Sequence, residues 1–530
     1  MIAQHPLFTG LLAPLLWLSL AQPGVAQPGI AQTPVRGGTA VIVVAADPGH
    51  LNPAISTAAN VHAVADSLFN ALIELDRNLR PQPDLALRWR VSNNGTVYTF
   101  TLAPNVKWHD GAPFTSADVK FTFDELLLKH HARSKAGIGA VITSIDAPAP
   151  DTVVFNLRKP YGALLQLLNV TEAPILPKHL YQGGDPLTHP VNLRPVGTGP
   201  FKFESYRTDQ QVVMVRNPNY FKPGLPYLDR LVFRVVPDSN AQSLALMGGE
   251  ADYLAPVNAA DVERLGARND LTLAQTAFGS GGGNCITTLG FNLDRKPLAD
   301  LRVRQAIAHA IDRQQILRDV QFGLGKVPTA PISSGLPWAH APGTLSRYGF
   351  SQQRATELLD AAGLPPGADG VRMNLELLHF PTFNRIGEVM RQNLAKVGIR
   401  VLQKPLDRAA FVEAVFSQRA FDANIISYCN GADPDSGVRR MYTSENIGKV
   451  PFSNAAAYRN PEVDKLFALA AESDNYDERS RHYAEVQKII ANDLPYWWLV
   501  ETVVTAAWRS RYEGWQPWSG QVAERAWVRP

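Results

Sequence analysis

The sequence predicts an α/β protein built from two or three domains. Its 530 residues are about three times the length of a typical domain. Hydrophobic residues make up 45% of the chain and charged residues 19%, a balance typical of soluble globular proteins. Strand-like segments dominate the middle of the chain, and from about residue 285 strands and helices alternate. This alternation predicts a parallel sheet in the second half.

The first residues form a predicted targeting segment. Residues 7–21, LFTGLLAPLLWLSLA, are apolar but too short to span a bilayer. Small residues that suit cleavage follow and end at Ala26 or Ala31. We therefore assign residues 1–31 to a signal peptide and spacer and expect a secreted, soluble protein. An uncleaved interfacial anchor is the alternative.

Composition and motifs exclude several classes of function. The chain has 51 Lys and Arg residues and 48 Asp and Glu residues, and it contains no long basic run. Nucleic acid is therefore not an expected partner. We find no nucleophile elbow, zinc-protease motif, phosphate loop or dinucleotide turn. Adjacent His130 and His131 do not present both rings to one ion. We therefore expect no catalytic residues, no metal site and no cofactor.

The two cysteines, Cys285 and Cys429, are expected to be paired if the protein is secreted. Sequence alone does not show that they are close. A bridge between them would close a loop of over a hundred residues. The chain-entropy model gives it about 5 kcal/mol as an upper figure.

The first half is expected to be rich in strands. One helix is predicted at residues 113–127, where Thr115 and Asp118 have the spacing of a capping box. Strands are predicted at residues 37–46, 97–104 and 152–160, followed by strand–turn–strand patterns across 197–237.

The second half contains the clearest pattern, a β-α-β-α-β run over residues 373–428. Strands are predicted at 373–380, 399–405 and 421–428, with helices at 385–398 and 409–418 between them. This order implies a parallel sheet. Ahead of the run we predict a strand at 288–293 and a helix at 301–320 that Asp300 can cap.

Loops after two of these strands carry charged residues that parallel pairing would bring to one edge. The loop at 380–385 leaves the first strand of the run, and the loop CNGADPDSG at 429–437 leaves the last. In open parallel sheets, ligands bind outside the carboxyl ends of the strands. We therefore expect Arg385 and the pair Asp433 and Asp435 to face one crevice.

Local chemistry suggests what these residues could do. Pro434 biases Asp433 towards an extended backbone, while Asp435 or Ser436 can cap the short helix predicted after it. Asp433 is then left without a structural role, and its carboxylate suits an incoming ammonium. Arg385 begins a predicted helix, where a guanidinium and free N–H groups favour a carboxylate. Opposite charges in one crevice match a zwitterion such as a short peptide; solvated surface side chains are the alternative.

Several blocks are specific enough to indicate a family. VKWHDG at 106–111 and RVRQAIAHAIDR at 302–313 stand out. With them, the chain resembles the extracytoplasmic solute-binding proteins of family 5, the dipeptide- and oligopeptide-binding components of ABC importers. The matching segments are residues 87–124, 196–221, 289–313, 355–365 and 460–470.

The resemblance implies a two-lobed type II periplasmic-binding-protein fold that closes on its ligand by hinge motion. One lobe would comprise residues 32–75, 194–284 and 500–530, with an extra β-rich domain inserted at 76–193. The other lobe would be residues 285–499. The resemblance also implies a periplasmic monomer that docks on the permease subunits of an ABC importer.

The resemblance assigns roles to single residues as well. In peptide-binding relatives, an aspartate in the loop matching GADPD holds the α-ammonium of the ligand, which points to Asp433, with Asp435 as the fallback. In dipeptide-binding relatives, an arginine at a helix start holds the carboxylate, which falls on Arg385. Some oligopeptide-binding members have a disulfide at the positions of Cys285 and Cys429.

Thr57 and Asn60 are further candidates, because residues 51–61 match a segment that lines the pocket of relatives. The pair Arg439 and Arg440 departs from the peptide-binding pattern, and the family also carries nickel complexes, opines and sugars. We therefore predict a non-enzymatic binding protein for short peptides. The alternatives are another solute such as a metal chelate, an opine or an amino-acid derivative, a secreted peptide hydrolase, or a sensor or chaperone.

Overall fold

The computed structural model describes residues 33–276, 284–448 and 451–530. The predicted signal peptide and spacer at residues 1–31 lie outside the described residues. The chain divides into residues 1–34 and residues 35–530, and the second unit holds the described helices and strands. Within the described ranges, no helix has both the length and the hydrophobicity to cross a bilayer.

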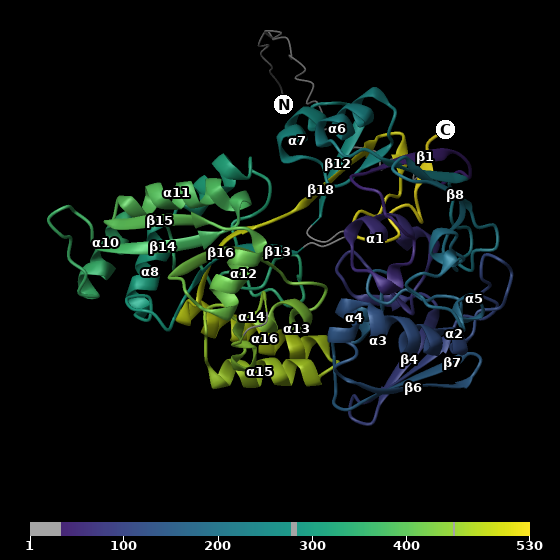
Figure 1. The fold of residues 1–530 in the computed structure, drawn as a ribbon, viewed down its shortest axis with the longest axis horizontal. Coiled ribbons are helices and arrows are strands. Elements are labelled where there is room, and N and C mark those ends of the chain that lie inside the picture. The colour runs from purple at the N-terminus through teal and green to yellow at the C-terminus, as the bar shows by residue number, and fades with distance from the viewer. Residues whose placement is uncertain (1–32, 277–283, 449–450) are drawn as a thin grey trace, which may run out of the picture. The chain divides into compact units, whose positions relative to one another are not determined.

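Seven strands form a mixed sheet that joins segments far apart in the sequence (Figure 1). β1 (Thr39–Val44) is the predicted buried strand, and it pairs in parallel with β10 (Arg230–Val235) and β11 (Tyr253–Leu254). The strand–turn–strand patterns form an antiparallel meander of β8, β9 and β10, as predicted. The order is β12-β18-β11-β1-β10-β9-β8, in which β8 spans Phe201–Arg207, β9 Gln211–Arg216, β12 Leu271–Thr276 and β18 Val504–Arg509.

A second, antiparallel sheet has the order β4-β5-β7-β6. Every second side chain of β5 and β7 is buried, which is the pattern that the alternating sequence predicts for a sheet with one covered face. α2 (Ser116–Phe121) begins with the predicted capping box, in which the Asp118 carboxylate accepts the Thr115 backbone N–H at 2.9 Å. The strands span Ala86–Ser92 (β4), Val97–Leu102 (β5), Ile142–Ala149 (β6) and Thr152–Leu157 (β7).

Five strands form the sheet of the second half, in the order β15-β14-β16-β13-β17. β14 lies between β15 and β16 and is parallel to both, which confirms the predicted β-α-β-α-β run. The connecting helices are α11 (Asn384–Ala395) and α12 (Arg408–Val412), the latter continued by a π-helical turn. The strands span Cys285–Phe291 (β13), Met373–His379 (β14), Ile399–Pro405 (β15), Ala423–Cys429 (β16) and Tyr496–Glu501 (β17).

The predicted continuous helix at residues 301–320 is wrong. α8 (Leu301–Ala310) is capped by Asp300 as expected, but it ends at Ala310, and Ile311 is extended. The backbone N–H of Asp312 donates to Asn393 Oδ1 of α11 at 2.8 Å instead of to the preceding turn. The Asp312 carboxylate then caps the short α9 (Arg313–Gln315). A partner from another helix therefore interrupts a segment whose apolar periodicity is continuous.

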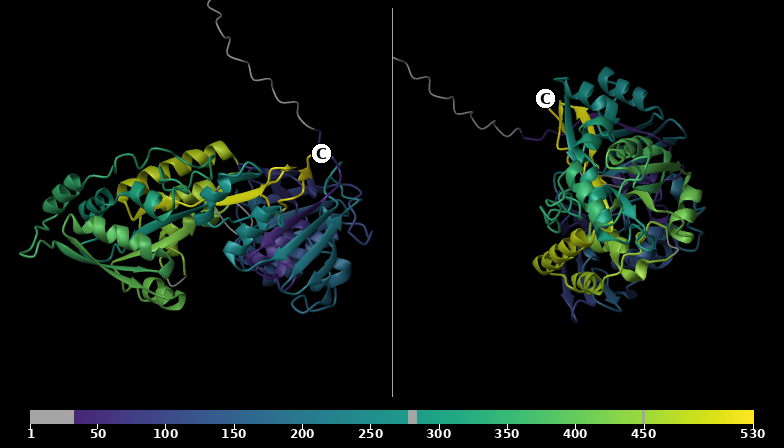
Figure 2. Two further views of the ribbon diagram at one scale, coloured as in Figure 1. Left: turned by 90° about the horizontal axis from the view of Figure 1, so that it is seen from above. Right: turned by 90° about the vertical axis from the view of Figure 1, so that its left-hand side faces the viewer.

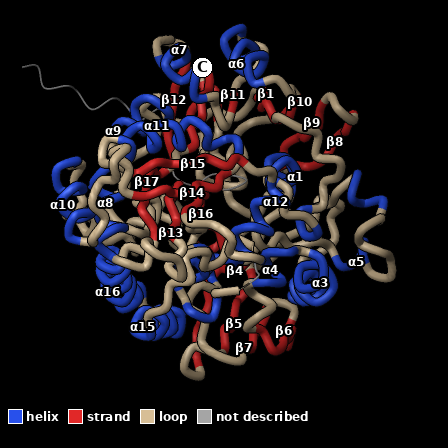
Figure 3. Tube along the Cα trace, turned by 60° about the vertical axis from the view of Figure 1, so that its left-hand side comes forward, coloured by secondary structure: helices blue, strands red, loops and turns tan. Residues whose placement is uncertain are grey.

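Helices surround the five-stranded sheet and share one hydrophobic core with it (Figure 3). Buried side chains of α8, α11, α15 and α16 pack with those of β13, β14 and β16. The two helices that follow β16 are short, α13 (Pro434–Gly437) and α14 (Arg439–Tyr442). The other helices of this region are α10 (Gln352–Ala361), α15 (Pro461–Glu472) and α16 (Tyr476–Asp493).

Short elements complete the first half and the C-terminal segment. The helices are α1 (Ala59–Ala65), α3 (Leu128–His130), α4 (Ala132–Ala136), α5 (Lys178–Tyr181), α6 (Ser239–Gly248) and α7 (Val262–Gly266). The strands are β2 (Ile73–Leu75), β3 (Pro81–Pro83), β19 (Tyr512–Glu513) and β20 (Trp527–Val528).

The chain passes from the five-stranded to the seven-stranded sheet through a short link. β17 ends at Glu501 and β18 begins at Val504, and the yellow ribbon of this segment can be followed in Figure 2. Thr502 donates its backbone N–H to Cys285 O at 2.9 Å. The link is therefore fastened to the first residue of β13.

Candidate binding site

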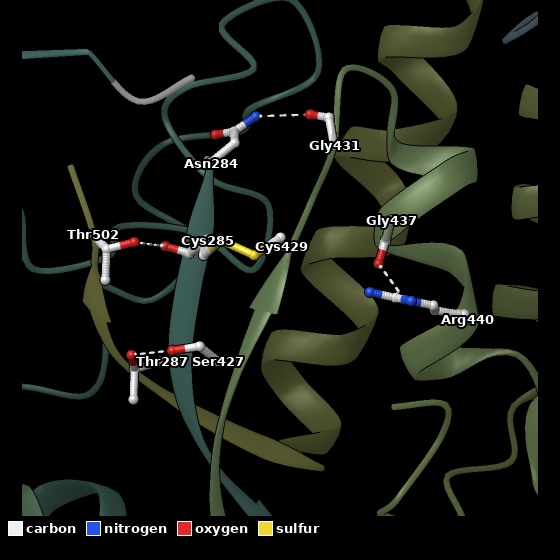
Figure 4. The surroundings of a disulfide bond; sticks show 9 residues. All are labelled: Asn284, Cys285, Thr287, Ser427, Cys429, Gly431, Gly437, Arg440 and Thr502. Carbon is white, nitrogen blue, oxygen red and sulfur yellow. Dashed lines mark hydrogen bonds between the residues drawn. A yellow bond between two sulfur atoms is a disulfide. The ribbon is translucent and has the colours of Figure 1, made fainter. Parts of the chain in front are cut away.

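A disulfide joins Cys285 and Cys429, which confirms the predicted bridge (Figure 4). The two residues lie directly opposite each other on the antiparallel strands β13 and β16. Beyond the bridge, the Asn430 backbone N–H donates to Asn284 O at 3.0 Å, and Asn284 Nδ2 donates to Gly431 O at 3.0 Å. The start of the 430–437 segment is thus fixed to the neighbouring strand.

That segment forms part of the wall of a cavity of about 700 Å³. Residues between Thr57 and Glu172 provide one part of the lining, and residues between Cys429 and Glu472 provide the other. A volume of this size is typical of sites for small ligands. Because both halves of the chain contribute, the cavity is the candidate binding site.

Asp433 has a structural role, contrary to the prediction that Asp435 caps the helix and leaves Asp433 free. Asp433 is the N-cap of α13, and its Oδ1 accepts the Asp435 backbone N–H at 2.9 Å. The physical reason is Pro434, because the residue before proline is held extended, which is also the conformation of an N-cap. Asp433 is fully buried and does not line the cavity.

The carboxylate of Asp433 is also paired with a buried arginine. Arg479 of α16 donates to its two oxygens at 2.7 and 2.8 Å. The remaining guanidinium N–H groups donate to carbonyls of Ala470 and Gly162 and to Tyr483 Oη. Although burial opposes the charge, Asp433 raises the pKa of Arg479. Both charges of the pair are therefore satisfied inside the protein.

Asp435 lines the cavity instead. Its side chain is 7% exposed, and Oδ1 accepts from Arg439 Nη1 at 3.1 Å. Burial raises the pKa of Asp435, and the attraction of Arg439 offsets this only in part. The second oxygen, Oδ2, accepts no hydrogen bond from any described residue.

Gln166 and Tyr161 also line the cavity, on the same wall as the Asp435 carboxylate. Gln166 is fully buried, and its Oε1 has no hydrogen-bond partner among the described residues. Its Nε2 contacts Tyr476 Oη. Burial and the negative charges of Asp435 and Asp433 raise the pKa of Tyr161, which keeps its hydroxyl protonated. Asp435 Oδ2 and Gln166 Oε1 are acceptors that receive no hydrogen bond from a described residue, so this part of the wall suits an ammonium or another donor group.

Two cationic side chains of the wall are already paired. Arg133 of α4 lies 2.8 Å from Glu172 Oε2. Arg439 lies 3.1 Å from Asp435 and 2.9 Å from Glu445. These arginines hold acidic groups of the wall in place.

Arg440 also lines the cavity but has no carboxylate partner among the described residues. Its Nε donates to Gly437 O at 3.3 Å (Figure 4). Within the described ranges, neither Nη group has an acceptor. Burial lowers the pKa of Arg440 because it disfavours the charged form.

The remaining predicted site residues are scattered. Thr57 lines the cavity, but Asn60 does not, and the Asn60 amide donates to Asp47 O at 2.6 Å. Arg385 is exposed in the first turn of α11 and is not part of the cavity wall. Its proposed contact with a ligand stays a prediction.

His62 lines the cavity, and its surroundings favour the protonated form. Its Nδ1 lies 2.9 Å from Asp66 Oδ1 and its Nε2 lies 2.8 Å from Ser56 O, so both nitrogens face acceptors. Burial disfavours the imidazolium, but the charge of Asp66 and the two hydrogen bonds outweigh it and raise the pKa of His62. Arg133 opposes this effect weakly.

We expect His62→Gln to cost more stability at pH 6 than at pH 9. A raised pKa in the folded state contributes stability that is complete below the unfolded value of about 6.5 and is lost as the pH rises through the folded value. Urea unfolding of both proteins at the two pH values measures the difference. His130→Gln is the control, because the His130 side chain makes no hydrogen bond with any described residue. A difference that is equal at both pH values would contradict an imidazolium at position 62.

Comparison with known proteins identifies the family. The family model for bacterial extracellular solute-binding proteins, family 5, matches residues 80–449. A candidate ABC transporter peptide-binding protein of Brucella ovis is 30% identical over 462 residues, or 84% of each chain.

The oligopeptide-binding protein AppA of Bacillus subtilis, solved with a nonapeptide, is 26% identical with a TM-score of 0.70, covering 94% of this chain and 100% of that one. HbpA2 of Haemophilus parasuis has a TM-score of 0.83 at 24% identity, covering 93% and 100%. The fold is that of the type II periplasmic binding proteins, as predicted, and the chain belongs to the extracellular solute-binding proteins of family 5.

Proposed function

We propose that the protein captures short peptides, or closely similar zwitterionic solutes, in the periplasm and delivers them to the permease of an ABC importer. The observation that carries the proposal is the cavity of about 700 Å³, whose wall presents the Asp435 carboxylate and the unpaired Gln166 Oε1. Both groups suit the α-ammonium of a peptide. The names of the relatives support the solute class, since they include peptide-binding proteins.

Closure around the ligand follows from the division of the chain. We assign residues 32–75, 194–284 and 500–530 to one lobe and 285–499 to the other, with the inserted domain at 76–193. The seven-stranded and five-stranded sheets support this division. A ligand that contacts both parts of the cavity wall stabilises the closed state, because only that state provides both sets of contacts. We expect the protein to act as a monomer and without catalysis.

The direct test is to identify the natural ligand. The protein is purified from its own organism without unfolding, and the small molecules released on denaturation are analysed by mass spectrometry. Peptides of a few residues support the proposal, whereas a metal chelate, an opine or a sugar replaces it with another solute. Incubating the protein with a synthetic peptide pool tests catalysis in the same instrument, and cleaved products would contradict a binding-only role.

We expect Asp435→Asn to weaken the binding of peptides with a free amino terminus by about 2–5 kcal/mol, because it leaves a buried ammonium without its counter-charge. Calorimetric titration with a pool of di- to tetrapeptides measures the change. N-acetylated versions of the same peptides lack the ammonium and should bind weakly to both proteins.

The control is Asp369→Asn, because Asp369 is exposed, pairs with Arg400 and does not line the cavity. It should leave peptide affinity unchanged. Equal affinity of Asp435→Asn and the unmutated protein for the free peptides would remove Asp435 from the site. The same titration with Asp433→Asn would then test the sequence-based prediction that Asp433 holds the α-ammonium.

A further inference from the structure

Arg440 differs from the three other arginines in or beside the cavity wall. Arg133, Arg439 and Arg479 each lie within 3.1 Å of a carboxylate oxygen. Arg440 contacts only the Gly437 carbonyl through Nε, and its two Nη groups have no acceptor among the described residues. Arg440 is therefore a guanidinium of the cavity wall whose charge no described carboxylate compensates.

This arrangement is costly for the protein without ligand. A buried or half-buried cation loses hydration free energy, and attraction to a nearby carboxylate normally offsets this loss. The lowered pKa of Arg440 has the same cause, since burial disfavours the cation and Tyr428 offsets this only in part. Groups held in an unfavourable state inside a cavity are candidates for ligand contact.

The position of Arg440 is fixed by the backbone around the disulfide. α14, which carries Arg440, follows α13 after a single residue. A Cβ at Gly437, the last residue of α13, would lie 2.2 Å from Asn430 O and 2.6 Å from Cys429 O. The chain therefore packs directly on the disulfide-bonded end of β16, and glycine is required at position 437. Figure 4 shows Arg440 beside this packed segment.

We propose that Arg440 binds a carboxylate of the ligand and thereby selects peptides that carry one. This inference rests on the proposed function and names a second contact of the same site. A guanidinium offers two parallel N–H donors that match the two oxygens of a carboxylate, and here both Nη groups are available. Asp435 and Gln166 receive the ammonium, and Arg440 receives the anionic end.

The carboxylate has two sources in a peptide, the C-terminus and an acidic side chain. Three sets of tetrapeptides separate them. The first has neutral side chains and a free C-terminus, the second has the same sequences with a C-terminal amide, and the third combines the amide with one glutamate. Binding to the unmutated protein, Arg440→Gln and Arg440→Lys is measured by calorimetry.

We expect Arg440→Gln to weaken the binding of carboxylate-bearing peptides about 10- to 100-fold, the range of a charge-assisted hydrogen bond. The amidated neutral set should bind the unmutated protein and Arg440→Gln equally. Arg440→Lys should keep part of the affinity, because it retains the charge and loses the bidentate geometry. If the first set responds and the third does not, the C-terminus is the source, and the reverse result identifies the acidic side chain.

A structural role for Arg440 gives a different result. Removing an uncompensated cation should leave the Tm of the ligand-free protein unchanged or higher, so a lower Tm for Arg440→Gln would contradict the proposal. Equal loss for charged and amidated peptides would also contradict it. If the unmutated protein binds none of the three sets, the peptide assignment fails. Arg440 is then tested against the ligand recovered from the native protein, and a recovered ligand without an anionic group would overturn the inference.

Discussion

Replacing Arg479 by leucine is expected to lower the free energy of unfolding by about 3–5 kcal/mol, because the Asp433 carboxylate would remain buried without its counter-charge. Both side chains are 0% exposed, so water cannot take the place of the guanidinium. Arg479 also donates to Gly162 O at 3.3 Å and to Ala470 O at 2.8 Å, and these carbonyls would lose their donors. Urea denaturation followed by tryptophan fluorescence measures the change.

The double variant Asp433→Leu/Arg479→Leu should lose less stability than the sum of the two single variants. It removes both charges together, so neither is left unpaired. Arg391→Leu is the control, because Arg391 is half exposed and pairs with Glu388 one helical turn away. An exposed pair of this kind contributes about 0–1 kcal/mol. Equal effects of Arg479→Leu and Arg391→Leu would contradict a buried ion pair at Asp433.

Removing the disulfide with Cys285→Ser/Cys429→Ser is expected to cost up to about 5 kcal/mol, since the bridge joins residues 144 positions apart and restricts the unfolded chain. Reductant should destabilise the unmutated protein by the same amount and leave the double variant unaffected. Thiol titration of the denatured, unreduced protein should find no free thiol.

A matched control comes from the same two strands. Thr287 and Ser427 lie opposite each other, with their hydroxyl oxygens 2.6 Å apart. Thr287→Ala/Ser427→Ala removes a contact between β13 and β16 and leaves the unfolded chain unrestricted, so it should cost only about 1 kcal/mol. Similar losses for the serine and alanine double variants would show that the bridge contributes only as a local contact.

The strands and helices of residues 373–428 were predictable because each is encoded by its own periodicity. β14, α11 and β15 follow the predicted boundaries within three residues. The break after α8 was not predictable, since it depends on Asn393 of α11, which captures the Asp312 N–H. The periodicity of a segment predicts a helix or a strand, but the break in this helix depends on a hydrogen-bond partner about eighty residues away in the chain.

The candidate site shows the same limit. The loop after β16 was predictable as a site because strand order places it at the sheet edge. The structural roles of its two aspartates were not predictable, because Arg479, which pairs with Asp433, lies 46 residues further along the chain. Gln166 and Arg133 carry no motif and reach the cavity only through the tertiary fold. In the sequence, the Arg439–Arg440 pair was only a departure from the peptide-binding pattern, and the carboxylate contact was expected at Arg385.

The link between β17 and β18 also bears on the energetics of ligand capture. Residues 502 and 503 contribute only about four soft backbone torsions between two strands that belong to different sheets. So short a tether keeps the two sheets at a high effective concentration relative to each other. Each sheet shares a hydrophobic core with residues of the cavity wall, Val141 and Tyr161 in one case and Ala432 in the other. A ligand that contacts both parts of the cavity wall therefore does not have to bring two separate molecules together, and most of the translational entropy cost of doing so is avoided. Lengthening this link with flexible residues should therefore weaken capture without changing a single contact to the ligand.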